Sequence, residues 1–187
     1  MKYFSFQWHI TEECDQRCKH CYIYALGSHA QFKMMTLSEM DRVIDNIETF
    51  KKKANREPYL YITGGDPILH PQFWELLERV KKKGWRMAIL GNPFHIDLES
   101  AKRMHECGVR KYQLSLDGLK PTHDRIRMEG SYDATIKTVK TLQKASIQVA
   151  CMTTVSKWNY QEIPSLIDEV VKANFDIFAF ARSEERR

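Results

Sequence analysis

Three cysteines near the N-terminus have the spacing of a metal site. Cys14, Cys18 and Cys21 stand in the pattern C-x-x-x-C-x-x-C, so their thiols can meet around one metal centre. A structural zinc ion usually takes four protein ligands, whereas a cubane iron–sulfur cluster held by three thiolates keeps one iron open to a further molecule. The spacing therefore predicts a metal site and leaves both kinds of centre open.

The zinc alternative would need a fourth ligand, which His9 or His20 could supply. Against it, the chain has no second C-x-x-C pair after Cys21. We expect Cys107, at a helix end, and Cys151, in a strand, to be small buried residues. Five cysteines in all, three of them clustered, argue against a disulfide framework and for a reducing compartment, with the cytoplasm as the default.

The segment TGGDP follows a strand-like run at residues 59–63. Gly64 and Gly65 would form a corner without side chains, where backbone amides and carbonyls can approach a small ligand. Asp66 adds a negative charge, and Pro67 fixes the path of the chain beyond it. An ordinary tight turn explains this segment equally well when it is considered alone.

A later run, residues 110–116, alternates in polarity like a strand. Gln113, Ser115 and Asp117 share one side of it. Polar side chains that face the inside of a fold need partners, and a polar ligand would supply them. A simple turn at Asp117 and Gly118 is the alternative for Asp117.

Alternating segments would carry these residues to one end of a sheet. Apolar residues at every second position predict six strands, at residues 3–10, 59–63, 85–90, 110–116, 147–154 and 175–180. Helical spacing predicts five helices, at residues 36–55, 71–83, 98–107, 132–145 and 160–173. Thr36 and Glu39 form a capping-box pattern, and Pro71 suits a first helical turn. This alternation implies parallel strands joined by right-handed crossovers, in an open doubly wound sheet or in a barrel.

The predicted metal and ligand residues all follow strands, and α/β folds build their sites at the carboxyl ends of strands. Other candidates share this position. Arg125 and Arg127 could pair with a carboxylate of a ligand, or on the surface with Asp124 or Glu129. The strand ends at Thr153, Thr154 and Arg182 could also face the site.

The composition restricts the possible partners. The chain has 187 residues and a net charge of +5, but its lysine runs at 51–53 and 81–83 fall at helix ends, which favours solvated surface over nucleic-acid binding. No apolar run approaches the roughly 18 residues of a membrane span, and the N-terminus lacks the pattern of a signal peptide. We therefore expect a soluble protein with no nucleic-acid or membrane partner.

Taken together, these motifs resemble the radical SAM superfamily. The resemblance rests on ECDQRCKHCY at 13–22, TGGDP at 63–67, SLDG at 115–118 and HDRIRMEGSYD at 123–133, and it covers nearly the whole chain. Among subgroups, the chain looks most like the core of SPASM-type peptide-modifying enzymes. The resemblance implies an α/β fold, a six-unit (β/α)6 partial TIM barrel. Because only residues 182–187 follow the last strand, we expect a single core domain, 1–187, that is truncated before its last helix, with any auxiliary-cluster domain beyond the C-terminus.

The resemblance also implies roles for individual residues. Cys14, Cys18 and Cys21 would hold a [4Fe-4S] cluster whose open iron chelates the amine and carboxylate of S-adenosylmethionine. GGDP resembles the GGEP segment that receives the methionyl ammonium, with Asp66 in place of Glu. Ser115 would contact the ribose. The residues that the resemblance assigns to S-adenosylmethionine are His20, Tyr22, Gly64, Gly65, Asp66, Pro67, Asn92, Ser115 and Asp117.

Two of these positions depart from the family pattern. His20 stands where the family usually has an aromatic residue against the adenine, although its imidazole can also stack, and Tyr22 lies beside it. Asn92 matches an Asn-Gly position of the family, but Pro93 replaces the glycine.

The activity implied by the resemblance is reductive cleavage of S-adenosylmethionine, followed by hydrogen abstraction from a substrate by a 5'-deoxyadenosyl radical. No side chain is assigned as an acid or base. We expect a peptide substrate, crosslinked or epimerised, and a one-electron reductant of the flavodoxin or ferredoxin type. The alternatives are an enzyme of cofactor or haem biosynthesis, a glycyl-radical activase or, from another class, a zinc-stabilised binding module.

Overall fold

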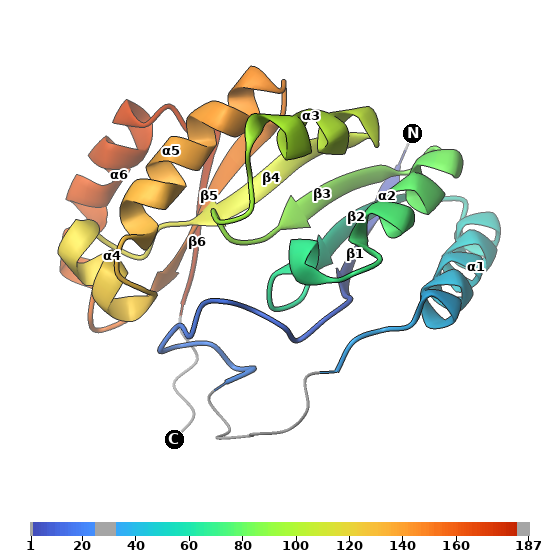
Figure 1. Ribbon diagram of the computed structural model, residues 1–187, viewed down its shortest axis with the longest axis horizontal. Helices are drawn as coiled ribbons and strands as arrows, with labels where there is room; N and C mark the ends of the chain where they lie inside the picture. The colour runs from blue at the N-terminus through green and yellow to red at the C-terminus, as the bar shows by residue number, and fades with distance from the viewer. Residues whose placement is uncertain (1, 25–32, 183–187) are drawn as a thin grey trace.

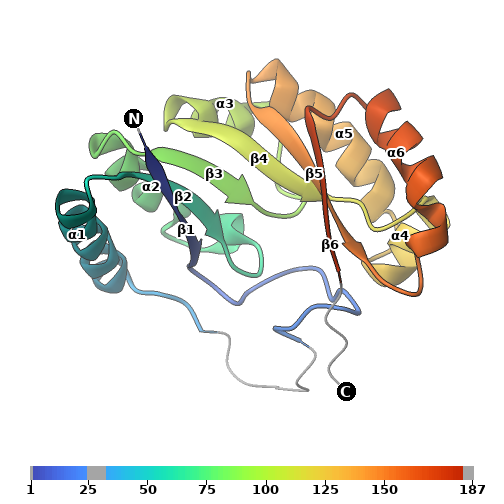
Figure 2. The same cartoon turned by 180° about the vertical axis from the view of Figure 1, so that it is seen from behind.

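Six parallel strands form one curled sheet in the computed structural model, which describes residues 2–24 and 33–182. The strands lie side by side in the order of the sequence, from β1 to β6. Their bounds are Tyr3–His9 for β1, Glu57–Thr63 for β2, Arg86–Leu90 for β3, Val109–Ser115 for β4, Gln148–Val155 for β5 and Ile177–Arg182 for β6. Helices cover one face of the sheet, and the other face is open (Figures 1 and 2).

Six α-helices connect the strands within the described residues. They are α1 at Leu37–Ala54, α2 at Phe73–Lys82, α3 at Leu98–Glu106, α4 at Lys120–Ile126, α5 at Ser131–Lys144 and α6 at Ile163–Lys172. Two 3-10 turns, η1 at Pro67–Leu69 and η2 at Tyr160–Glu162, precede α2 and α6. In the described part of the chain, no helix is long and apolar enough to cross a bilayer.

Local chemistry explains where the first helix begins and ends. The Thr36 hydroxyl accepts a hydrogen bond from the Glu39 amide at 3.3 Å, and the Glu39 carboxylate accepts one from the Thr36 amide at 2.7 Å. The predicted capping box is therefore confirmed. The helix ends at Asn55, which takes the left-handed conformation with φ of 50°.

The alternation within the strands separates a core face from an open face. Leu60 and Ile62 of β2 are fully buried among the helices, whereas Tyr59 and Tyr61 are half-buried on the other face. The same division in β4 buries Leu114 and leaves Gln113 and Ser115, its polar neighbours, on the open face. The open face thus collects the polar residues of the sheet.

The structure corrects several of the predicted bounds or elements. The short helix α4 was not predicted, because it has seven residues and too few apolar positions to show a helical period. α2 begins at Phe73, so Pro71 lies in the turn before it. The predicted helix at 160–173 begins as the separate 3-10 turn η2. β6 begins at Ile177, because the Phe175 amide donates a hydrogen bond to the Val170 carbonyl at 3.2 Å and so belongs to the end of α6.

Candidate metal and cofactor site

The cysteine segment leaves the carboxyl end of β1 and crosses the ends of the neighbouring strands toward α4 (Figure 1). Backbone hydrogen bonds to the glycine corner and to α4 help fix its path. Gly65 donates to the Thr11 carbonyl at 2.8 Å, and Asp66 donates to the Glu13 carbonyl at 2.7 Å. Farther along, the Lys19 amide donates to the Ile126 carbonyl at the end of α4 at 2.9 Å.

A cavity of about 660 Å³ lies between this segment and the strand ends. All three predicted cluster ligands line it as free, half-buried cysteines. The predicted residues that the structure brings together in this lining are Cys14, Cys18, Cys21, His20, Tyr22, Gly64, Gly65, Asn92 and Ser115. Asp66, Pro67 and Asp117 are buried outside the lining.

Asn92 connects the end of β3 to the cysteine segment. Its side-chain amide donates to the Cys14 sulfur at 3.1 Å and to the Asp15 carboxylate at 2.8 Å. Burial raises the pKa of the Cys14 thiol to about 11, although the hydrogen bond from Asn92 opposes this rise. Cys14 is therefore a neutral thiol near pH 7 in the free protein, and a bound metal would have to displace its proton.

The described residues contain no preformed site for a single zinc ion. Among residues 2–24 and 33–182, no three His, Cys, Asp or Glu side chains are close enough to hold one metal ion. A zinc ion with bonds of about 2.3 Å would draw its thiolates to within about 4 Å of one another. The two candidate fourth ligands have other contacts, since His9 lies 3.1 Å from the Tyr22 hydroxyl and His20 lies 3.7 Å from Asp117. Three thiols around a wide cavity fit the larger iron–sulfur cluster.

The glycine corner is required by the approach of the cysteine segment. A Cβ atom on Gly64 would lie 2.2 Å from the Thr11 carbonyl oxygen, and one on Gly65 would lie 2.1 Å from the Glu13 carbonyl oxygen. The sequence suggested that these glycines make room for a ligand. The structure adds that they make room for the backbone that carries the cysteines.

Asp66, the residue after this corner, is a fully buried carboxyl group without a cationic partner among the described residues. Its Oδ1 accepts a hydrogen bond from the Asn92 amide at 3.4 Å, and its Oδ2 has no side-chain partner there. Burial raises the pKa of Asp66 to about 8. Pro67, the next residue, begins the turn η1.

Asp117 and Arg127 form a buried ion pair behind the cavity. Arg127 Nε lies 2.5 Å from Asp117 Oδ2, with the side chains 13% and 0% exposed. Burial alone would raise the pKa of Asp117, but the guanidinium of Arg127 reverses this and holds the pKa below its usual value. The surface pairing of Arg127 with Asp124 or Glu129, which the sequence offered as an alternative, is therefore wrong. Asp124 instead accepts from the Tyr132 amide at 2.9 Å, at the start of α5.

Several lining residues were not assigned from the sequence. Gln7 lies on the polar side of β1, and the alternation of that strand was the signal that could have identified it. Gln113 lies on the polar side of β4, where the alternation did place it, but it was given no role. Thr154 and Arg182, considered as strand-end candidates, do line the cavity, whereas the Thr153 hydroxyl is buried and donates to the Leu116 carbonyl at 2.7 Å. Arg127, which the sequence offered as a candidate partner for a ligand carboxylate, also lines the cavity.

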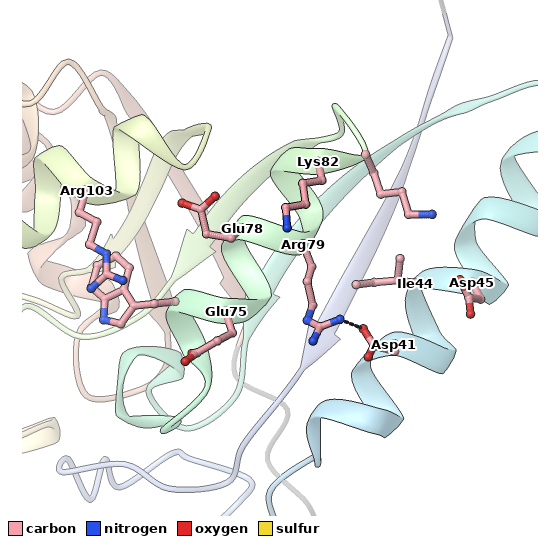
Figure 3. A pocket seen from close by; sticks show the side chains of 10 residues that line it. Asp41, Ile44, Asp45, Glu75, Glu78, Arg79, Lys82 and Arg103 are labelled. Carbon is pink, nitrogen blue, oxygen red and sulfur yellow. Dashed lines mark hydrogen bonds and ion pairs between the residues drawn. The ribbon is translucent and has the colours of Figure 1, made fainter.

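A second hollow, of about 720 Å³, lies on the helix-covered face among α1, α2 and α3 (Figure 3). Arg79 pairs with Asp41 across it at 2.7 Å, and the Arg103 guanidinium lies 4.2 Å from the centre of the Trp74 ring. The described residues that line it include no cysteine or histidine. We assign the chemistry to the cavity at the strand ends instead.

A family model described as the Radical SAM superfamily matches residues 8–170. The chain belongs to the radical SAM superfamily. This family uses a [4Fe-4S] cluster and S-adenosylmethionine, which agrees with the donor set of the cavity. The predicted family, fold class and cofactors are thus confirmed.

Relatives and solved structures resemble this radical SAM chain along most of its length. Fe-coproporphyrin III synthase of Methanosarcina barkeri is 32% identical over 162 residues, which are 86% of this chain and 39% of that protein. AdoMet-dependent heme synthase of the same organism is 30% identical over 158 residues, 83% of this chain and 44% of that protein. SuiB of Streptococcus suis, solved bound to its precursor peptide SuiA, shares the fold with a TM-score of 0.78 and 18% identity, over 98% of this chain and 40% of SuiB. This chain spans less than half the length of each of the three proteins.

Proposed function

We propose that this chain is the catalytic core of an enzyme that cleaves S-adenosylmethionine reductively and abstracts a hydrogen atom from a substrate. The observation that carries the proposal is the convergence of three free cysteines with Gly64 and Ser115 on one cavity at the strand ends. The bound cluster would supply the electron for the cleavage, after reduction by a flavodoxin or ferredoxin type of partner, and the 5'-deoxyadenosyl radical would take the hydrogen atom.

The residues of the chain would bind and orient the cofactors. Cys14, held by Asn92, and the other two cysteines would ligate the cluster. The exposed backbone of the glycine corner and the Ser115 hydroxyl would receive the polar groups of S-adenosylmethionine. His20 and Tyr22 border the same cavity, where their rings suit contact with the adenine. Walls on several sides would keep water from the reacting atoms.

The open face of the sheet offers a place for the substrate. Tyr61 and Lys111 precede two cavity residues, Thr63 and Gln113, by two positions, so they lie on the same face of their strands. The Lys111 ammonium lies 4.7 Å from the centre of the Tyr61 ring and 3.1 Å from its hydroxyl. A cation among aromatic rings suits a flat substrate that carries carboxylates.

We therefore favour a substrate of the cofactor or haem type, which is the alternative that the sequence left open. Two curated relatives at 30% and 32% identity are named for haem-related products. The second candidate is a peptide, the substrate first expected from the sequence. It is favoured by the likeness in fold to SuiB, which was solved with a precursor peptide.

The activity is tested by anaerobic reconstitution with iron and sulfide, followed by reduction in the presence of S-adenosylmethionine. We expect 5'-deoxyadenosine from the protein and from a Cys107→Ala control, and none from a variant with alanine at Cys14, Cys18 and Cys21. Equal product from the triple variant would contradict the proposal.

The substrate class is tested by titration with coproporphyrin III, a porphyrin that carries four carboxylates, followed by its absorbance. We expect binding that weakens about tenfold in Lys111→Met, which corresponds to about 1.4 kcal/mol. The control is Lys172→Met, at an exposed lysine of α6. Absence of binding by the unmodified protein would reject the haem-type substrate and leave the peptide.

A further inference from the structure

Three consecutive residues of the cysteine segment contact either the end of α4 or the buried Asp117–Arg127 ion pair. They are Cys18, Lys19 and His20. The Cys18 sulfur lies 3.8 Å from Arg127 Nη1, at the residue that follows α4. The Lys19 amide donates to the Ile126 carbonyl at 2.9 Å. His20 Nε2 lies 3.7 Å from Asp117 Oδ2. The middle cysteine thus contacts Arg127, whereas Cys14 accepts a hydrogen bond from Asn92.

The Arg127 guanidinium has a fixed position because Asp117 is itself held on several sides. Asp117 Oδ1 accepts from the Thr154 amide at 2.8 Å, and the Asp117 amide donates to His123 Nδ1 at 3.0 Å. The Asn159 side chain donates to the Asp117 carbonyl at 2.9 Å. With Nε bound to Asp117, the remaining end of the guanidinium faces Cys18.

We infer that Arg127 is a positioning residue for Cys18 that also sets the reduction potential of the centre ligated there. This inference rests on the proposed function. A cation fixed beside a ligand sulfur stabilises an added electron, so it raises the potential. Removing Arg127 would therefore lower the potential. It would also leave the negative Asp117 unpaired, and that charge would lower the potential further.

The test compares Arg127→Met, Arg127→Lys and the control Arg42→Met, an exposed arginine of α1 whose side chain is 73% exposed. Each protein is reconstituted anaerobically, and the iron content and midpoint potential are measured without S-adenosylmethionine. We expect less iron and a more negative potential in Arg127→Met. Arg127→Lys should partly recover the potential, because lysine keeps the charge but loses the fork that reaches both Asp117 and Cys18. Arg42→Met should match the unmodified protein.

Arg127→Met alone leaves a buried carboxylate without its partner and could fail to fold. A double variant, Arg127→Met with Asp117→Asn, removes that charge and keeps the test decisive. We expect its potential to remain more negative than that of the unmodified protein, by less than in Arg127→Met, because the lost cation lies beside Cys18 while the loss of the Asp117 charge offsets part of the shift. An unchanged potential with a full iron content in both Arg127→Met variants overturns the inference. A higher KM for S-adenosylmethionine as their sole change would also overturn it. If the unmodified protein forms no cluster, the proposed function itself fails.

Discussion

At the scale of single residues, two buried aspartates near the site differ in their surroundings. Asp117 has an arginine, a backbone amide and a nearby histidine as partners, so it remains ionised. Asp66 accepts a long hydrogen bond of 3.4 Å from the Asn92 backbone amide, and its Oδ2 has no side-chain or cationic partner in the described part of the chain. The same side chain is therefore a fixed anion at one strand end and a protonated group at another.

We expect Asp66→Asn to stabilise the metal-free protein more at pH 8 than at pH 6. The pKa of Asp66 is raised from 3.8 to about 8, so between these values the folded state keeps a proton that the unfolded state has lost. Stability therefore falls as the pH rises through this range, by up to about 1.4 kcal/mol per pH unit. Asparagine does not ionise, so it removes this loss. The free energy of unfolding of Asp66→Asn, relative to that of the unmodified protein, should therefore grow by about 2 kcal/mol between pH 6 and pH 8.

Urea unfolding of both proteins at the two pH values measures this difference. Asp168→Asn, at an exposed position of α6, is the control and should show the same stability change at both. An advantage of Asp66→Asn that does not vary with pH would contradict the assigned ionisation.

At the scale of elements, the site depends on a segment with no regular structure of its own, held by the glycine corner, Asn92 and α4. The sequence could predict the strand ends that meet there, because period-two alternation identifies β2 and β4 and their polar residues. It could not predict α4, which is short and has no apolar stripe. For the same reason, the pairing of Arg127 with Asp117 was not evident, since it depends on where α4 places its end.

Gly65→Ala should displace the cysteine segment. The added Cβ would lie 2.1 Å from the backbone oxygen of Glu13, and a backbone atom cannot move away without its segment. We expect a loss of about 1–3 kcal/mol in the free energy of unfolding and fewer iron atoms bound per chain after reconstitution.

Gly84→Asn is the matched control, because no atom lies within 4 Å of a Cβ at Gly84 and asparagine tolerates its φ of +68°. It should bind iron like the unmodified protein. Full iron binding by Gly65→Ala would show that the corner does not position the cysteines.

At the scale of the whole molecule, the curled sheet has a helix-covered face and an open face (Figures 1 and 2). The cofactor cavity is lined by residues at the carboxyl ends of the strands. Parallel pairing followed from the alternation of segments, but the sequential strand order did not, because a doubly wound sheet would show the same alternation. The choice between a flat sheet and a curled one came from the resemblance to a family, because curvature arises from packing between elements and has no local sequence pattern. The open face, with Tyr61 and Lys111, is where we expect the substrate to bind.

The central claim is that three cysteines hold a [4Fe-4S] cluster with one iron open to S-adenosylmethionine. The most direct measurement is electron paramagnetic resonance of the reduced, reconstituted protein with and without S-adenosylmethionine, together with metal analysis. The account predicts close to four iron atoms per chain and a spectrum that changes when S-adenosylmethionine binds. One zinc ion per chain with no cluster signal, or a cluster spectrum that does not respond to S-adenosylmethionine, would contradict it.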